Sequence, residues 1–187
     1  MPKASVKRLI ECKKEDLIKL VLDIEKYPEF VPFCFDAKVY ENKNEGDLTK
    51  IIADLTIGKG PFKDTYKSDV VFDGKKDSIF VKNIEGPLNH LSNNWIFVDK
   101  ENGITEVTFD IDFEIKNKFL NSLMIVSFQF GLEKIADAFQ KRAEHYLAAL
   151  RTRFRAFFTV AFCIKDLFLL LNKHLFISIL APFLTPI

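Results

Sequence analysis

The chain has 187 residues, of which 48% are hydrophobic and 28% charged, a composition typical of a globular protein with a substantial core. Residues 151–187 hold five Lys/Arg and one Asp, a net +4, which leaves −3 for residues 1–150 of the +1 total. The body therefore lacks the strong positive charge typical of proteins that bind the phosphate backbone of nucleic acid.

The cysteines argue against two kinds of site. Cys12, Cys34 and Cys163 are an odd number without Cys-x-x-Cys spacing, which disfavours a disulfide framework and a Cys-based zinc site. The first residues contain no apolar run of secretory length. We therefore expect a reducing, cytoplasmic setting, with peripheral location at the inner membrane as an extension of that hypothesis.

The N-terminal region predicts a strand followed by a helix. Residues 4–12 alternate loosely between apolar and polar positions, as in a strand. Over residues 13–24 the apolar residues recur at helical spacing, and Glu15 and Asp16 fall in the first turn, where the helix dipole favours anions.

Two prolines interrupt the next segment, residues 23–34. The residue before a proline is disfavoured in helical geometry, so Tyr27-Pro28 and Val31-Pro32 predict a turn and a short helical piece. The segment is rich in aromatics but has no His or Ser, which favours an apolar connector over a catalytic loop.

From about residue 35 to 115 the period changes to two. Six strand-like runs are separated by turn signals such as Asp73-Gly74 and Asn102-Gly103. The runs are residues 35–43, 47–57, 62–72, 77–85, 93–100 and 105–115. Their short connections predict an antiparallel meander, because parallel strands need long crossovers.

Residues 119–150 return to helical spacing, with a stripe that includes Leu132, Phe139 and Ala143. The predicted order is β-α-β6-α, an α+β fold with one long C-terminal helix across a curved antiparallel sheet. We expect residues 1–150 to form one domain and residues 151–187 a basic, apolar extension. Three interpretations of this extension stay open: a membrane-surface anchor, a helix docked on the body, or a segment without selected function.

Several short motifs occur together in residues 3–150. They are Asp23-x3-Tyr27-Pro28-Glu29-Phe30-Val31-Pro32-Phe33-Cys34, Gly60-Pro61-Phe62, Gly86-Pro87-Leu88, Trp95-x-Phe97, Val107-x-Phe109-x-Ile111-x-Phe113-Glu114 and Ala138-Phe139-x2-Arg142-Ala143. In this order they resemble the START-like (helix-grip, Bet v 1-like) superfamily. Within it the chain is similar to the family of coenzyme-Q-binding proteins and ribosome-association toxins, which is polyketide cyclase/dehydrase-like.

The resemblance implies a helix against a bent antiparallel sheet, with an apolar ligand held between them. One branch of the family is associated with ubiquinone (coenzyme Q) and cellular respiration. The other is described as binding the large ribosomal subunit and blocking subunit joining. The motifs do not separate the two branches.

An apolar ligand needs inward-facing apolar side chains and few ionisable groups. We expect lipid contacts from the proline-rich segment, from the sheet and from the early turns of the long helix. These residues are Tyr27, Phe30, Val31, Phe33, Phe62, Trp95, Phe97, Phe109, Leu123, Val126 and Phe130. For any one of them plain core packing is the commoner role.

Catalytic signals are weak. There is no His-x-x-Glu-His, Gly-x-Ser-x-Gly or P-loop motif, and His90, His145 and His174 lie far apart. Asp54, Tyr66, Glu85 and Asp110 could point inward, but a solvated strand face is the favoured interpretation. For Arg142 a structural salt bridge, with an acid from the sheet or near Glu144, is favoured over contact with a quinone head group or RNA.

Three functions are consistent with these residues and motifs. The main hypothesis is a non-enzymatic carrier of ubiquinone or a similar prenyl lipid, with no catalytic residue, no metal and no cofactor besides the carried ligand. The alternatives are a ribosome-association toxin and a polyketide cyclase-like enzyme.

Overall fold

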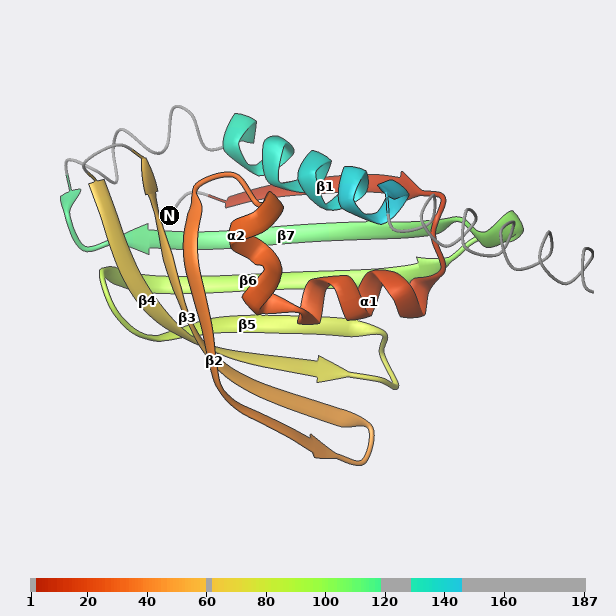
Figure 1. The fold of residues 1–187 in the computed structure, drawn as a ribbon, viewed down its shortest axis with the longest axis horizontal. Helices are drawn as coiled ribbons and strands as arrows, with labels where there is room; N and C mark the ends of the chain where they lie inside the picture. The colour runs from red at the N-terminus through yellow and green to blue at the C-terminus, as the bar shows by residue number, and fades with distance from the viewer. Residues whose placement is uncertain (1–2, 60–61, 119–128, 146–187) are drawn as a thin grey trace, which may run out of the picture. The chain divides into compact units, whose positions relative to one another are not determined.

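The computed structural model describes residues 3–59, 62–118 and 129–145, which form a seven-stranded sheet with helices on one face (Figure 1). The elements, in chain order, are β1 (Lys3–Ile10), α1 (Lys14–Leu22), η1 (Ile24–Lys26), α2 (Tyr27–Phe30), β2 (Cys34–Glu45), β3 (Leu48–Lys59), β4 (Phe62–Asp73), β5 (Ser78–Glu85), β6 (Leu88–Asp99), η2 (Glu101–Gly103) and β7 (Thr105–Ile115). Residues 129–145 are helical and are called the long helix below. The α+β class and the β-α-β6-α order are confirmed.

All strand pairs are antiparallel, and the sheet order is β1-β7-β6-β5-β4-β3-β2. Strands β2 to β7 thus form the predicted meander, and β1 closes the far edge by pairing with β7. The strand predicted at residues 93–100 is wrong at its start, since β6 begins at Leu88. His90, expected in a turn, lies inside β6 opposite Glu114.

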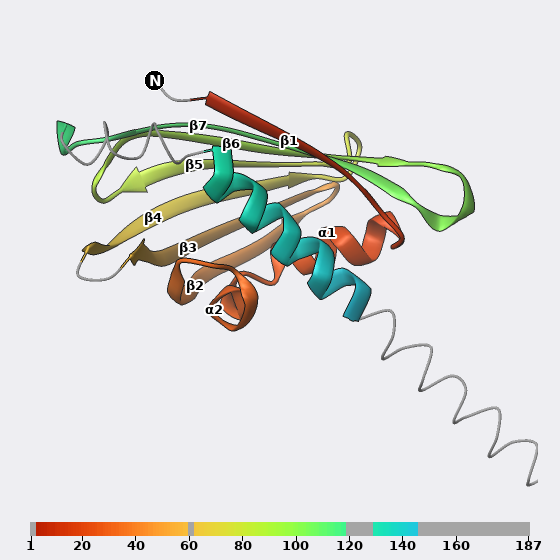
Figure 2. The same ribbon diagram turned by 90° about the horizontal axis from the view of Figure 1, so that it is seen from above.

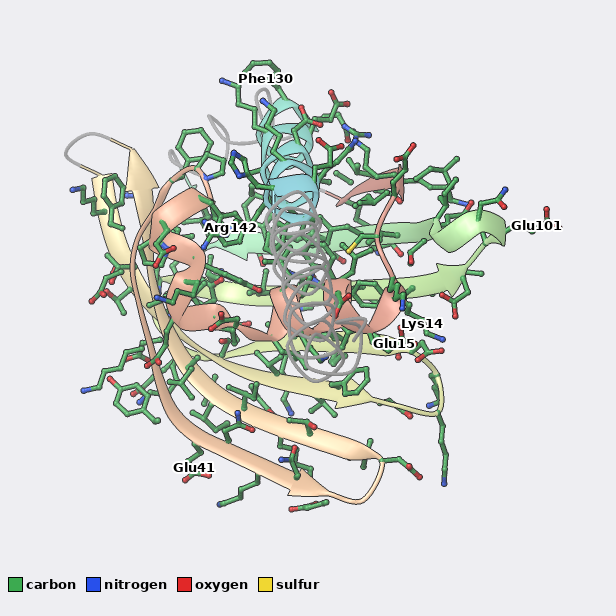
Figure 3. All side chains as sticks on the ribbon, turned by 45° about the vertical axis from the view of Figure 1, so that its right-hand side comes forward. Lys14, Glu15, Glu41, Glu101, Phe130 and Arg142 are labelled. Atoms are coloured by element: carbon green, nitrogen blue, oxygen red, sulfur yellow. The ribbon has the colours of Figure 1, made fainter. Side chains whose placement is uncertain are left out.

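Helix α1 buries one side and is anchored by a lysine. Leu17, Ile18 and Val21 are buried, as the helical spacing predicts. The Lys14 ammonium, labelled in Figure 3, lies 2.7 Å from the Asp77 carboxylate and 2.9 Å from that of Asp99. These hydrogen bonds, the one to Asp77 first, hold the pKa of Lys14 above its ordinary value and join α1 to the sheet.

The two views of the ribbon place α1, α2 and the long helix on the same face of a curved sheet (Figures 1 and 2). We call this face the inner face. One row of directly paired residues crosses it on five strands: Phe72, Ile79, Trp95, Phe109 and Val6. The long helix packs on this face through Leu132, Ala136, Phe139 and Ala143, all at most 5% exposed.

Leu132→Ala is expected to lower the free energy of unfolding by about 3 kcal/mol, because Leu132 is 1% exposed and the substitution leaves a cavity. Urea unfolding followed by circular dichroism measures the change. The control is Lys141→Ala on the exposed side of the same helix, which should change stability by less than about 0.5 kcal/mol. Equal effects of the two variants would contradict this packing.

Candidate functional site

The ring of Phe139 joins the proline-rich segment to the sheet. Its centroid lies 5.3 Å from that of Tyr27, 5.1 Å from that of Phe30 and 5.1 Å from that of Trp95, each in edge-to-face geometry. Trp95 stacks on Phe109 at 3.9 Å and lies 6.5 Å from Phe97. We call these six residues the aromatic cluster. It contains five of the residues that the sequence predicts as lipid contacts, brought together around Phe139, which was not among them.

The sequence around α2 explains how its aromatics reach the cluster. Pro28 stands in the first turn of α2, and Val31 is extended, as the residue before Pro32 tends to be. The Tyr27 hydroxyl donates a hydrogen bond to the backbone carbonyl of Val21, which ties α2 back to α1. The predicted turn and short helical piece are therefore confirmed as η1 and α2.

Phe33, next to Pro32, has an unusual backbone. Its φ is 69°, in the left-handed region that a bulky residue rarely adopts, and its side chain is 39% exposed. The Phe33 carbonyl accepts a hydrogen bond from the Gly58 amide at 3.0 Å, which fixes the segment to β3. The preceding Val31 is half-buried.

A charged pair also links α2 to the long helix. The Arg142 guanidinium lies 2.8 Å from the Glu29 carboxylate and 5.3 Å from the centre of the Phe30 ring. Figure 3 shows Arg142 beside α2. The expected role in an ion pair is confirmed, but the predicted partner was wrong, because the acid comes from α2 rather than from the sheet or Glu144.

The middle of the inner face is uncharged and partly accessible. Val81, Asn93 and Ile111 are directly paired neighbours on β5, β6 and β7, and all three are half-buried. Fully buried rows lie on both sides of them: Ile79, Trp95 and Phe109 on one side, Leu91 and Phe113 on the other. The middle row of the inner face is therefore partly accessible, whereas the rows on both sides of it are buried.

The remaining predicted contacts are Phe62, Leu123, Val126 and Phe130, and among these only the side chain of Phe130 is described. Phe130 was expected to face the sheet, and this orientation is wrong: its side chain is 63% exposed and points away from the sheet (Figure 3), with the Lys134 ammonium 4.4 Å from its ring centre. Phe62 begins β4, but its side chain lies outside the described part of the structure. Leu123 and Val126 lie outside the described residues.

Inward-facing Asn93 and Tyr66 were missed as candidate contacts. Tyr66 packs against the buried cluster of Leu88, Leu91 and Phe113, although a solvated position was favoured for it. Asn93 precedes Trp95 and Phe97 at a spacing of two, so the alternation of β6 was the signal that places it on their face.

Residues 10–142 match the model of the family described as polyketide cyclase/dehydrase and lipid transport. The chain belongs to this family. Its fold is shared with a START superfamily protein from Mycobacterium smegmatis, with a TM-score of 0.67 and 19% identity over 77% of this chain and 98% of that one.

Two relatives carry different functional names. The ribosome association toxin RatA of Rickettsia prowazekii (strain Madrid E) is 29% identical over 143 residues, which cover 75% of this chain and 94% of the relative. The mitochondrial coenzyme Q-binding protein COQ10 of Dictyostelium discoideum is 30% identical over 129 residues, which cover 67% of this chain and 60% of the relative. The two family motifs around Tyr27 and Phe139 are those that meet in the aromatic cluster.

Within this polyketide cyclase/dehydrase and lipid transport family, the interior ionisable groups show what chemistry the inner face supports. Burial raises the pKa of the Tyr27 and Tyr66 hydroxyls above the ordinary range, and it raises the pKa of the Cys34 thiol to about 11. All three are neutral at physiological pH, so none of them is an ionised base there, and the Tyr27 hydroxyl and Cys34 thiol already donate to backbone carbonyls. The described histidines lie elsewhere, since His90 faces Asp112 and His145 is exposed.

Two further findings concern only the described ranges. Within residues 3–59, 62–118 and 129–145, no group of three His, Cys, Asp or Glu side chains is placed to hold a metal ion. No helix in that part of the chain combines the length and apolar character needed to cross a membrane.

The Arg142–Glu29 pair predicts a pH-dependent contact between α2 and the long helix. Hydrogen bonds from Lys26 and then Arg142 lower the pKa of Glu29 below its ordinary 4.5. Because this pKa is lowered on folding, the ion pair stabilises the folded state at pH values above the ordinary pKa of Glu29. This stabilisation is lost as the pH falls through the lowered pKa of the folded state. We expect Arg142→Met to speed amide exchange in α2 at pH 7, with little change in global stability, because the pair is exposed.

Hydrogen–deuterium exchange of wild type and Arg142→Met at pH 7 and below pH 4 checks this contact, with Lys141→Ala as the control on the same helix. The difference between wild type and Arg142→Met should shrink at the lower pH. An α2 exchange rate that the substitution leaves unchanged at pH 7 would show that the pair does not restrain the segment.

Proposed function

We propose that the protein binds ubiquinone or a similar prenyl lipid without chemical conversion, in support of respiratory electron transport. The observation that carries the proposal is the inner face: its middle is uncharged and half-buried, and buried rows bound it on both sides. Family membership and the relative named for coenzyme Q binding support the choice of ligand. The neutral state of Tyr27, Tyr66 and Cys34 argues against an ionised general base among these three groups.

Apolar contact alone supplies enough affinity for such a role. Each buried CH₂ of a prenyl tail contributes about 0.8 kcal/mol, so ten buried carbons contribute on the order of 8 kcal/mol before ordering costs. Micromolar binding corresponds to about 8 kcal/mol, so a tail longer than ten carbons covers those costs.

We place the entrance for the lipid at the segment of Val31 and Phe33. The ring of Phe33 is exposed although it is apolar, and its backbone is held in a costly conformation. A strained backbone conformation persists where the surrounding structure holds it. Here the hydrogen bond from the Gly58 amide and the neighbouring Pro32 hold the backbone of Phe33. An exposed aromatic beside the cluster gives an incoming tail its first apolar contact.

Trp95 provides a direct test, because it is the only tryptophan in the chain and it lies in the aromatic cluster. Titration of the purified full chain with decylubiquinone should quench its fluorescence saturably. Mass spectrometry of lipid extracted from the freshly purified protein gives an independent readout. Free N-acetyltryptophanamide is the control for collisional quenching.

Quenching no stronger than that of the free indole, together with protein that purifies without prenyl lipid, would rule out the carrier function. Saturable quenching alone would support binding of the quinone. Recovery of a prenyl lipid other than ubiquinone would support the wider class and exclude ubiquinone as the resident ligand.

Ribosome association is the second candidate, and a different surface favours it. The match to the relative named RatA covers 94% of that protein. On the outer face of the sheet Lys63 lies 3.6 Å from the ring centre of Phe35, and Lys38 lies 5.0 Å from that of Tyr40. Both rings are about half exposed, and Lys38 and Lys63 form no ion pair within the described residues. Lysines beside exposed aromatics suit contact with RNA.

If this surface contacts the ribosome, Lys38→Glu with Lys63→Glu should abolish sedimentation of the protein with large ribosomal subunits in sucrose gradients. The matched control is Lys43→Glu with Lys50→Glu on β2 and β3 of the same sheet, where both lysines already pair with acids. Wild-type protein that stays at the top of the gradient would exclude the ribosomal function.

Two finer points stay predictions. A cyclase-like reaction would need two or more ionisable side chains converging on the inner face, and the family description includes such enzymes. The membrane-surface contact, the division at residue 150 and the peripheral location concern residues 151–187, which lie outside those described.

A further inference from the structure

One polar side chain interrupts the apolar middle of the inner face. Asn93 lies in a row of directly paired residues that crosses all seven strands, and the only other polar member is the exposed Asn42 on the edge strand β2. From β3 to β1 the row runs Ile51, Val70, Val81, Asn93, Ile111 and Ala4. An amide in such a row costs free energy unless it is hydrogen-bonded.

The Asn93 amide oxygen has no hydrogen-bond partner among the described residues. Three buried side-chain oxygens in those residues lack one: Asp54 Oδ1, Asn93 Oδ1 and Asp112 Oδ1. The two carboxylates are paired through their other oxygen, Asp54 with Tyr40 and Asp112 with Lys3. The Asn93 amide forms no side-chain hydrogen bond within the described part of the chain.

The neighbouring polar residues of the inner face are different, because the protein itself satisfies them. The Ser68 hydroxyl donates to the Ala53 carbonyl at 3.1 Å, and the Asn83 amide donates to the Leu88 carbonyl at 3.3 Å. These two residues are therefore structural. Asn93 alone of the three keeps its hydrogen-bonding capacity for something else.

The Asn93 residue is partly accessible, although its amide oxygen itself is buried. It is half-buried, as are its neighbours Val81 and Ile111, and the residue two positions along β6 is Trp95 of the aromatic cluster. A ligand lying along the inner face would thus pass from the aromatic cluster to the amide.

We propose that Asn93 is the polar anchor of the ligand site, and that it takes a neutral ring oxygen, either a hydroxyl or a carbonyl, on an otherwise apolar ligand. The inference rests on the proposed lipid-binding function and assigns the head-group contact within it. An amide suits both oxidation states of a quinone, because its oxygen accepts from a hydroxyl and its nitrogen donates to a carbonyl. The uncharged surroundings exclude a phosphate or carboxylate head group, which would be buried without a cation.

Asn93→Leu separates this role from packing. Removing an unpaired buried amide should raise the unfolding temperature of the ligand-free protein, whereas a structural asparagine would lower it on substitution. Affinity for decylubiquinone and decylubiquinol should fall about three- to tenfold, the loss of one net hydrogen bond. Affinity for n-decylbenzene, which has the tail but no ring oxygen, should not change.

The matched control is Asn83→Leu, which breaks an existing hydrogen bond and should lower the unfolding temperature. Full-length protein is used throughout, and bound ligand is measured by mass spectrometry after gel filtration. Asn93→Val carries the same test if leucine is too large for folding.

Three results would overturn the inference. One is an equal loss of affinity for n-decylbenzene, and another is a lower unfolding temperature for both Asn93 variants. The third is unchanged affinity for both ring-oxygen ligands, which leaves the lipid-binding function intact if wild type still binds them. Wild type that binds none of the three compounds defeats the proposed function and the Asn93 assignment together.

Discussion

The contact of Phe139 with Tyr27, Phe30 and Trp95 is the interaction on which the rest of the structure depends. It joins three segments that lie far apart in sequence: the short helix α2, the middle of the sheet and the long helix. Edge-to-face ring pairs stabilise the structure beyond the effect of their buried area, and they prefer particular geometries. They therefore fix the orientation of the long helix as well as its packing on the sheet. The Arg142–Glu29 pair adds a second, exposed link between the same two helices.

This arrangement explains how two distant motifs of the chain act together. The residues Tyr27-Pro28-Glu29-Phe30 supply two rings and a carboxylate, while Phe139 and Arg142 supply the ring and guanidinium that meet them. Neither motif has an evident role alone. Together they set the distance between the long helix and the sheet at one end of the inner face, and this distance governs what fits beside the helix further along.

Much of the fold could be predicted because the alternation in most strands is clean. Thr105–Ile115 alternates along its whole length, and its predicted bounds agree with β7. The first residues of β6 could not be recognised, since a bulge between Leu88 and His90 breaks the alternation there. The partner of Arg142 could not be found either, because an ion pair between residues 113 positions apart leaves no local pattern.

The site was predicted unevenly for a related reason. Phe30, Trp95 and Phe109 were found through motifs and strand spacing, but Phe130 was assigned to the wrong side of the helix. It stands two residues before Leu132, about 200° around the axis, so the two cannot share one face. Asn93 was passed over as a polar residue, although its spacing from Trp95 placed it inside. Periodicity identifies the face of a residue, whereas its hydrogen-bonding state depends on neighbours in other strands.

The pleat of the sheet also explains how relatives with one fold can carry two functional names, ribosome association toxin and coenzyme Q-binding protein. Successive residues of a strand point to opposite faces of the sheet. The inner-face side chains of β3 to β7 can therefore change without altering the lysines and aromatics on the outer face of β2 to β4. Each surface is therefore free to be kept or lost independently. The two proposed surfaces are compatible within one chain, because no residue named for one surface takes part in the other.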